Sequence, residues 1–512
     1  MHLSRMRLLL PALLVALAAR ASAQPVGVAE RSIADLRTAL STGRLSCRTL
    51  VSAYLARIAR YDKAGPAINA IIVTHPRALS IADSLDGVRR TGRPLGALHC
   101  MPLIVKDNFE TFDLPTTAGS LSLAGWIPPR DATMVARVRA AGAVILAKAN
   151  LAEWAFTPYE TVSSILPGYT KNPYALDRVT AGSSGGTAAA VAASFGVAGL
   201  GTDTGNSIRG PSAHQALVGI RSTMGLTSRA GVVPLNSGAD VAGPMARTVA
   251  DAVELFDLLT GVDVDDPVTR DAAAHQVRDY RQFLARDGLR NARIGVLRQA
   301  YERPSADTAV VRVFHRAIGD LRRAGAIVID TARVVALDSI LRSQQGACNP
   351  FARDLAHYFA TRGSNSPVKT VDDVLKSGQY HPTVQLRLQQ AQSATPPDSA
   401  PGCTSRERAR AALRIAVTQL MDSLQLDALV YPTWSNPPRL IGDLNTPHGD
   451  NSQLFSPMTG FPAITVPMGY TRTTLPAGIT FFGRAWSEPT LIRVAYSYEQ
   501  ATRHRRAPAS TP

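Results

Sequence analysis

The stretch TAGSSGGTAAAVAASFGVAGLGTDTGNSIRGPS, residues 180–212, contains two glycine- and serine-rich segments, GSSGG at 182–186 and GTDTGNS at 201–207. Between them, residues 187–198 carry no charged side chain. Glycine lets a backbone turn through positive φ and lets other groups approach closely. A serine hydroxyl becomes a nucleophile once a base takes its proton. We therefore expect this stretch to hold reactive serines beside a buried helix and a short strand.

Outward from this stretch, helical patterns alternate with short apolar runs that are typical of buried strands. The predicted strands lie at 68–73, 103–105, 143–146, 197–200, 294–297, 428–431, 463–466 and 478–482. The predicted helices between and around them lie at 77–90, 132–141, 186–195, 250–259, 308–323, 407–424 and 489–500. This alternation indicates an α/β fold, a sheet with helices on both faces.

A chain of 512 residues would by default divide into two or more domains. Prolines and glycines are spread out, however, and no clean linker separates two units. We therefore expect one large α/β domain over residues 24–502. Between 335 and 425 the strand pattern disappears, which predicts a variable helical insertion that caps the substrate site. The polar tail at 503–512 is expected to be disordered.

The N-terminus has the pattern of a secretory signal peptide. Arg5 and Arg7 precede the apolar run 8–19, and Ala-Ser-Ala ends at Ala23. That run is too short to span a bilayer comfortably, and no later segment is long and apolar enough. We predict cleavage after Ala23 and a secreted or periplasmic protein without stable membrane insertion. A retained N-terminal anchor is the alternative.

The formal net charge of +16 raises the question of nucleic acid binding. The basic residues are dispersed, and the one tight cluster, RHRR at 503–506, lies in the polar tail. A solvated basic surface explains this distribution better than a nucleic acid site.

The four cysteines are even in number, as in a disulfide-bonded exported protein. Cys348 and Cys403 flank the variable region and could pair, but connectivity does not follow from sequence. No cysteine stands in a CxxC or histidine-rich metal spacing, so the sequence supports no metal site.

The segment at 182–186 also fits G-x-S-x-G, the nucleophile elbow of α/β-hydrolases, with Ser184 at its centre. That elbow needs a buried strand directly before it. Residues 174–180 instead read as a polar loop, and no histidine lies in a context that suggests a Ser-Asp-His triad. The sequence therefore disfavours an elbow at Ser184.

Three blocks together resemble the amidase signature family: PLIVKDN at 102–108, AGSSGG at 181–186 and GLGTDTGNSIRGPS at 199–212. The serines in the family's register are 24 residues apart, which selects Ser183 rather than Ser184 as the relay. The resemblance implies a mixed, twisted sheet covered by helices. It also implies a Ser207 nucleophile, a Ser183 relay on a cis peptide with Gly182, and a Lys106 base, with no metal or cofactor.

A lysine base has to be neutral, and burial at the end of an apolar strand would lower the pKa of Lys106. The backbone N–H groups of Thr204, Gly205 and Asn206 are expected to form the oxyanion hole. Asn206 stands where the family usually has glycine, and asparagine tolerates positive φ better than other non-glycine residues. Ala181 is a milder departure at another usual glycine.

The neighbouring polar residues are expected to support the site. Asp203 and Arg209 should bond around the nucleophile turn, and Ser184 should bond locally or line the pocket. Lys148 also ends an apolar strand, but its context resembles a structural segment of the family.

The resemblance predicts hydrolysis of a carboxamide C–N bond through an acyl-enzyme, releasing a carboxylic acid and ammonia or an amine. The partner would be a small-molecule or peptide amide, and the protein a monomer or homodimer. Two alternatives stay open: a non-catalytic amide-binding protein, and the glutamine-hydrolysing subunit of an amidotransferase. The second works in the cytosol with partner subunits, which an exported precursor argues against.

Overall fold

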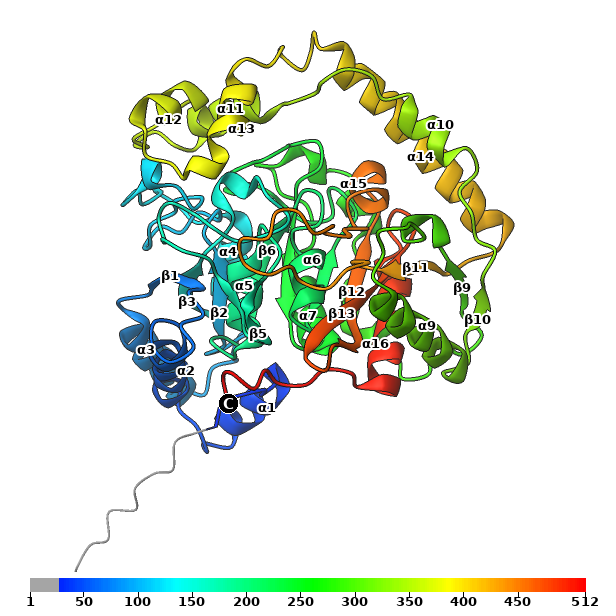
Figure 1. Ribbon diagram of the computed structural model, residues 1–512. Coiled ribbons are helices and arrows are strands. Elements are labelled where there is room, and N and C mark those ends of the chain that lie inside the picture. Colours follow the sequence, from blue (N-terminus) through cyan, green and yellow to red (C-terminus); the bar gives the residue numbers. More distant parts are fainter. Residues whose placement is uncertain (1–26) are drawn as a thin grey trace, which may run out of the picture.

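The computed structural model describes residues 27–512, and an 11-stranded mixed sheet runs through the molecule (Figure 1). In sheet order the strands are β1 (Ile71–Thr74), β3 (Val144–Ala149), β2 (Pro102–Lys106), β6 (Ala198–Asp203), β8 (Val241–Ala246), β7 (Val218–Arg221), β12 (Ala463–Thr471), β13 (Leu475–Phe482), β11 (Ala428–Pro432), β9 (Arg293–Val296) and β10 (Ile327–Ile329).

The helices surround this sheet. They are α1 (Ile33–Ser41), α2 (Cys47–Tyr61), α3 (Ala78–Arg90), α4 (Thr133–Ala140), α5 (Gly185–Ala192), α6 (Arg209–His214), α7 (Val249–Leu259), α8 (Ala272–His275), α9 (Thr308–Arg323), α10 (Leu337–Arg342), α11 (Phe351–Thr361), α12 (Val371–Ser377), α13 (Gln385–Gln392), α14 (Pro401–Ser423), α15 (Phe455–Thr459) and α16 (Glu488–Thr502). Ser32 and Ser46 cap α1 and α2 by accepting backbone N–H bonds.

The central strands β2 and β6 place two predicted site residues at one edge of the sheet. β2 runs parallel to both β3 and β6, with Val105 opposite Leu200. Every residue of β2 and β6 is buried. Since successive side chains point to opposite faces, both faces of the sheet are covered here, as the alternating sequence pattern predicts. Lys106 and Asp203 end these two strands at the same edge.

The segment before GSSGG differs from the loop predicted there. Residues Ala175–Val179 form strand β5, which pairs antiparallel with β4 (Lys171–Asn172). These two strands form a separate small sheet, and most of β5 is exposed or half-buried. The prediction of a loop at 174–180 was wrong, because it relied on the absence of an apolar run, and the strands of a short exposed hairpin do not need one. The buried strand that an elbow at Ser184 would need is still not found here.

Residues 335–425, all of which the structure describes, contain helices and no strand. In Figure 1, helices α10 to α14 form an arch over one end of the molecule, with α10 beside α14 on one side and α11 to α13 on the other. A disulfide between Cys348 and Cys403 joins the chain before α11 to the first turn of α14.

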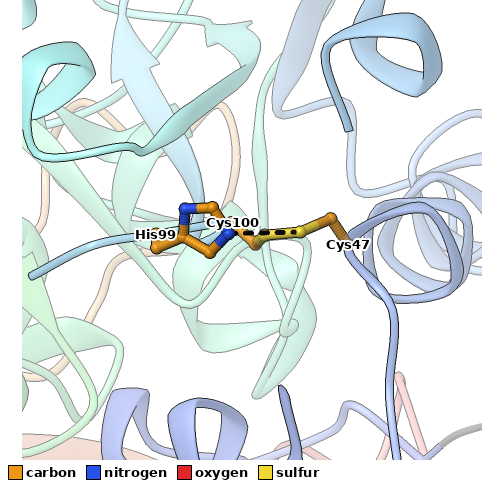
Figure 2. Close-up of side chains that lie close together, drawn as sticks. All are labelled: Cys47, His99 and Cys100. Carbon is orange, nitrogen blue, oxygen red and sulfur yellow. Dashed lines mark hydrogen bonds between the residues drawn. A yellow bond between two sulfur atoms is a disulfide. The ribbon is translucent and has the colours of Figure 1, made fainter. Parts of the chain in front are cut away.

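A second disulfide joins Cys47 to Cys100 beside the ring of His99 (Figure 2). One sulfur or nitrogen atom of each of these three residues lies within 4.8 Å of the others. Cysteine binds metals as a thiolate, and the disulfide removes both thiols of this group. All four cysteines are thus paired in the described part of the chain.

The C-terminal residues 503–512 differ from the disordered tail predicted for them. Arg505 forms an ion pair with Glu30 at 2.7 Å and donates to the hydroxyl of Tyr174 at 3.1 Å. The carbonyl oxygen of Pro512 accepts a bond from Arg57 at 2.9 Å. The tail is held by partners from distant segments, which local polarity does not reveal. The predicted signal peptide lies outside the described residues.

None of the helices within residues 27–512 combines the length and apolar character that crossing a membrane requires.

Candidate active site

Lys106 lies at the end of β2 and is fully buried. Its Nζ donates to the Oγ of Ser183 at 2.8 Å and to the Oγ1 of Thr202 at 2.7 Å. Burial lowers the pKa of Lys106 to about 7, and the carboxylates of Asp240 and Asp203 oppose this only in part. An amine with this pKa is substantially neutral near pH 7 and can accept a proton from a hydroxyl.

Two glycines let the segment that carries Ser183 pack closely against neighbouring backbone. A Cβ at Gly182 would lie 2.3 Å from the carbonyl oxygen of Glu160, and one at Gly186 would lie 2.2 Å from that of Asn150. Any larger residue would push the segment away. The Gly182–Ser183 peptide bond is cis, as the resemblance predicts. The glycine-rich segment is therefore needed for packing as well as for turning.

Ser184 faces the neighbouring strand instead of Lys106. Its Oγ donates to the carbonyl oxygen of Thr202 at 3.1 Å and accepts from the N–H of Thr202 at 3.3 Å. This hydroxyl joins the start of α5 to β6, which agrees with the local bonding expected for it.

Ser207 lies at the wall of a cleft and is 5% exposed. Its hydroxyl donates to the Oδ1 of Asn206 at 3.5 Å. Within residues 27–512, no hydrogen bond joins Ser207 to Ser183. The structure thus brings Lys106 and Ser183 into direct contact and leaves the Ser207 hydroxyl turned elsewhere.

The turn between β6 and α6 presents a row of backbone donors. Residues Thr204, Gly205, Asn206 and Ser207 all line the cleft. Among the described residues, none of their four N–H groups donates to a protein acceptor. Backbone N–H groups without a protein acceptor in a cleft can stabilise an oxyanion. This turn is where the sequence predicts the oxyanion hole.

Asp203 anchors that turn through two guanidinium groups. Arg209 bonds both oxygens of the carboxylate, at 3.0 and 3.1 Å, and Arg221 bonds one at 3.0 Å. Burial alone would raise the pKa of Asp203, but the two cations outweigh it and hold the pKa at about 2. Arg209 also donates to the carbonyl oxygen of Gly205 at 2.7 Å. The expected supporting role of Asp203 and Arg209 matches these bonds.

Asn206 does not need the glycine-like conformation that the resemblance suggested. Neither Gly205 nor Asn206 has positive φ, whereas Ala181 has φ of +60°. The left-handed backbone position is therefore at Ala181, where we expected the replacement of the family's usual glycine to matter less. The Nδ2 of Asn206 donates to Asp450 at 2.8 Å. Burial raises the pKa of that carboxyl to about 6.

Lys148 is as buried as Lys106 but has a different environment. Its Nζ forms an ion pair with Asp107 at 3.0 Å and donates to the carbonyl oxygens of Phe109 and Pro115. These partners cross-link β3 to the loop after β2, away from Ser183. The structural role expected for Lys148 agrees with this geometry.

Sequence reasoning missed three residues that hold the site together: Thr202, Arg221 and Asp450. Thr202 immediately precedes Asp203 in the nucleophile block, and the parallel pairing of β2 with β6 places it beside Lys106. Its place beside Asp203 in the nucleophile block was the sequence signal that could have pointed to it. Arg221 and Asp450 come from other segments, and no local pattern marks them.

The cleft has a volume of about 390 Å³, which suits a small-molecule site. One wall is the turn that carries Ser207, and another comes from α13 and α14 of the arch. The predicted insertion therefore does contribute to the cleft.

Comparison with known proteins gives consistent findings. The family model described as Amidase matches residues 49–492. A probable amidase of Arabidopsis thaliana is 33% identical, covering 94% of this chain and 92% of the plant protein. The crystal structure of a peptide amidase from Stenotrophomonas maltophilia superposes with a TM-score of 0.84 at 36% identity, covering 95% of this chain and all of that one. One subunit of the glutamyl-tRNA(Gln) amidotransferase of Acinetobacter baumannii is 32% identical, over 92% of this chain and 96% of its own length.

Proposed function

Because the chain belongs to the amidase signature family and is an amidase that hydrolyses amide C–N bonds, we propose that Ser207, Ser183 and Lys106 carry out the cleavage. The observation that carries this proposal is the 2.8 Å bond from Lys106 to Ser183, together with the lowered pKa of that lysine. A neutral amine held against a hydroxyl is a base that can activate a serine without histidine.

In the proposed first step, Lys106 accepts the proton of the Ser183 hydroxyl while Ser183 accepts the proton of Ser207. The Ser207 oxygen bonds to the carbonyl carbon of the amide, and the negative charge moves to the carbonyl oxygen. When this intermediate collapses, the C–N bond breaks, Ser183 gives a proton to the departing nitrogen, and Lys106 returns a proton to Ser183. Water then attacks the Ser207 ester by the same relay and releases the carboxylic acid.

The relay requires the Ser207 hydroxyl to turn from Asn206 towards Ser183 when substrate binds. Catalytic hydrogen bonds are often long or poorly aligned before substrate is present. The developing oxyanion would bond to the N–H groups of Thr204, Gly205 and Asn206, whose lack of protein acceptors within residues 27–512 supports this assignment.

We propose small-molecule or peptide amides as substrates, since the structural relative named above is a peptide amidase. The second candidate is a glutamine-hydrolysing component of an amidotransferase, which the likeness to the Acinetobacter protein favours. The purified chain alone should hydrolyse simple anilides or peptide amides. Activity that appears only with added partner subunits would favour the second candidate.

Labelling with a fluorophosphonate tests the nucleophile and also separates an enzyme from an amide-binding protein. We expect one adduct on Ser207, because only an activated serine reacts. The Ser207→Ala variant should form no adduct, and its turnover rate should fall at least about 10³-fold. Ser184→Ala is the matched control, since its hydroxyl bonds only to the backbone of Thr202. An adduct that persists in Ser207→Ala would move the nucleophile to another residue.

A further inference from the structure

The cleft beside Ser207 carries positive charge and no acidic side chain. Arg387, Arg406 and Arg410 line it, and no aspartate or glutamate of the described chain does. Guanidinium groups gathered on the wall of a cleft attract anions and disfavour cations. This charge is more than hydrolysis of a neutral amide requires.

Two of the three arginines are less suited to binding a ligand. Arg410 donates to the carbonyl oxygens of Met458 at 3.0 Å and Gly238 at 2.6 Å, and it pairs with Glu407 at 2.8 Å. Arg387 is exposed and donates to the carbonyl oxygen of Phe156. Arg410 thus uses several of its donors within the protein, and the charge of the exposed Arg387 is solvated by water.

Arg406 is different. Its one hydrogen bond within residues 27–512 is a long one, 3.4 Å from Nη1 to the carbonyl oxygen of Cys348, and no carboxylate there pairs with it. The side chain is half-buried. Burial and the neighbouring charge of Arg410 lower the pKa of Arg406, so its environment opposes the positive charge. An anion bound at this guanidinium would relieve that cost.

The position of Arg406 is fixed from two sides. It follows Cys403 by one turn of α14, so both lie on the same face of the helix. The disulfide from Cys403 to Cys348 ties this turn to the preceding segment. Ser405 adds two bonds to Gln345, one from its Oγ to the carbonyl oxygen at 2.8 Å and one from the N–H of Gln345 at 3.0 Å. A cation held this way has a defined place in the cleft.

We propose that the enzyme selects amides that carry a carboxylate, which Arg406 binds while the scissile carbonyl lies against Ser207. Guanidinium and carboxylate match in bidentate geometry, which gives both affinity and orientation. This proposal rests on the function proposed above, since it assigns a second group of the same substrate. Arg406 is then a residue that determines specificity.

Two matched pairs of anilides test it. The first pair, succinyl and 4-oxopentanoyl 4-nitroanilide, places a carboxylate or a neutral ketone on the acyl side. The second pair, 4-acetamidobenzoate and 4-acetylacetanilide, does the same on the amine side. We expect kcat/KM for the charged member of one pair to exceed that of its neutral partner at least about tenfold. Equal values within both pairs would overturn the proposal.

The variant Arg406→Gln should reduce this charged-to-neutral ratio by about tenfold or more, and Arg406→Lys should keep part of it. Arg408→Gln is the matched control, because Arg408 is on the same helix but exposed and outside the cleft lining. If Arg408→Gln lowers the ratio as much as Arg406→Gln, general charge and not this site causes the preference.

A binding measurement separates this proposal from the proposed function. Calorimetric titration of the Ser207→Ala variant with the charged anilide of the preferred pair, succinyl 4-nitroanilide or 4-acetamidobenzoate, needs no turnover. We expect the Kd to rise at least about tenfold when Arg406→Gln is added. An unchanged Kd would overturn the carboxylate site even if hydrolysis is confirmed. If the fluorophosphonate does not label the unmutated enzyme, the catalytic assignment is overturned, whatever this titration shows.

Discussion

At the scale of single residues, two buried lysines show how environment decides role. Lys106 is the last residue of β2, Lys148 is the last but one of the neighbouring β3, and the two are equally buried. Lys148 has the carboxylate of Asp107 at 3.0 Å, which favours the charged form. Within the described chain, Lys106 bonds only to the hydroxyls of Ser183 and Thr202. Burial lowers the pKa of both lysines, but at Lys148 the contacting carboxylate of Asp107 opposes this, whereas the amine of Lys106 lies against the hydroxyl that it has to deprotonate.

The pH dependence of turnover tests this difference. A base must be neutral to accept a proton, and the pKa of Lys106 is lowered to about 7. The neutral fraction therefore grows as the pH rises through 7, and kcat/KM should increase there before it levels off. The measurement is kcat/KM for a neutral anilide from about pH 5.5 to about pH 9. A flat profile over this range would contradict the assignment of Lys106 as base.

The variant Lys106→Met provides the control for this profile. It should lose the pH-dependent activity, since no other described lysine contacts Ser183. Circular dichroism would verify that the variant remains folded.

At the scale of elements, the turn from β6 to α6 depends on charges contributed by other segments. Asp203 ends β6, Arg209 opens α6 and Arg221 ends β7, and all three side chains are fully buried. The turn between them presents the donors of Thr204 to Ser207. A buried ion pair of this kind contributes less to net stability than to holding one conformation, and breaking it is costly.

Asp203→Asn tests the role of this anchor. The change keeps the shape but leaves two buried guanidiniums without their counter-charge, so we expect the free energy of unfolding to fall by about 3–5 kcal/mol. Urea unfolding measures it, with the exposed Asp398→Asn as control. A loss no larger than that of the control would contradict the proposed anchoring.

Acid unfolding gives a second measure of how much Asp203 contributes to stability. The folded pKa of about 2 lies below the unfolded value of about 3.9, so this contribution is present above about pH 4 and is lost as the pH falls towards about 2. The Asp203→Asn variant should lack this part of the acid transition.

At the scale of the whole molecule, the two disulfides support the proposal that the protein is exported. They close loops of 53 and 55 residues at opposite parts of the chain. Such bridges persist in oxidising compartments and are rare in the cytosol. Figure 1 also shows the C-terminus beside α1, where the tail packs on the first helices.

Mass spectrometry of the protein produced with export intact should give an N-terminus near Gln24 and no free thiols. Peptide mapping without reductant should recover Cys47–Cys100 and Cys348–Cys403. Reduction should lower the free energy of unfolding by about 4 kcal/mol for each bridge, because the unfolded chain regains loop entropy. A mature chain that begins at Met1 with four alkylated cysteines would contradict both export and pairing.

Much of the fold could be predicted because its signals are local. The full length of α9 and the central strands β2, β3 and β6 follow from short patterns. The strands β5 and β7 and the ordered tail could not be predicted in this way. β5 lies in a largely exposed hairpin with β4 and shows no apolar run, and β7 is only four residues long. The tail is held by partners that lie far away in the chain.

The sequence by itself determined the family and the α/β class, and it selected Lys106, Ser183 and Ser207 as candidate catalytic residues, because these depend on motif identity and spacing. Only the tertiary structure decided which groups touch them. Thr202 reaches Lys106 across a separation of 96 residues, and the order of strands in the sheet sets that contact. The arginines of α13 and α14 line the same cleft as Ser207, because the arch of helices lies over this end of the molecule. Such contacts depend on long-range packing, which no local pattern of residues specifies.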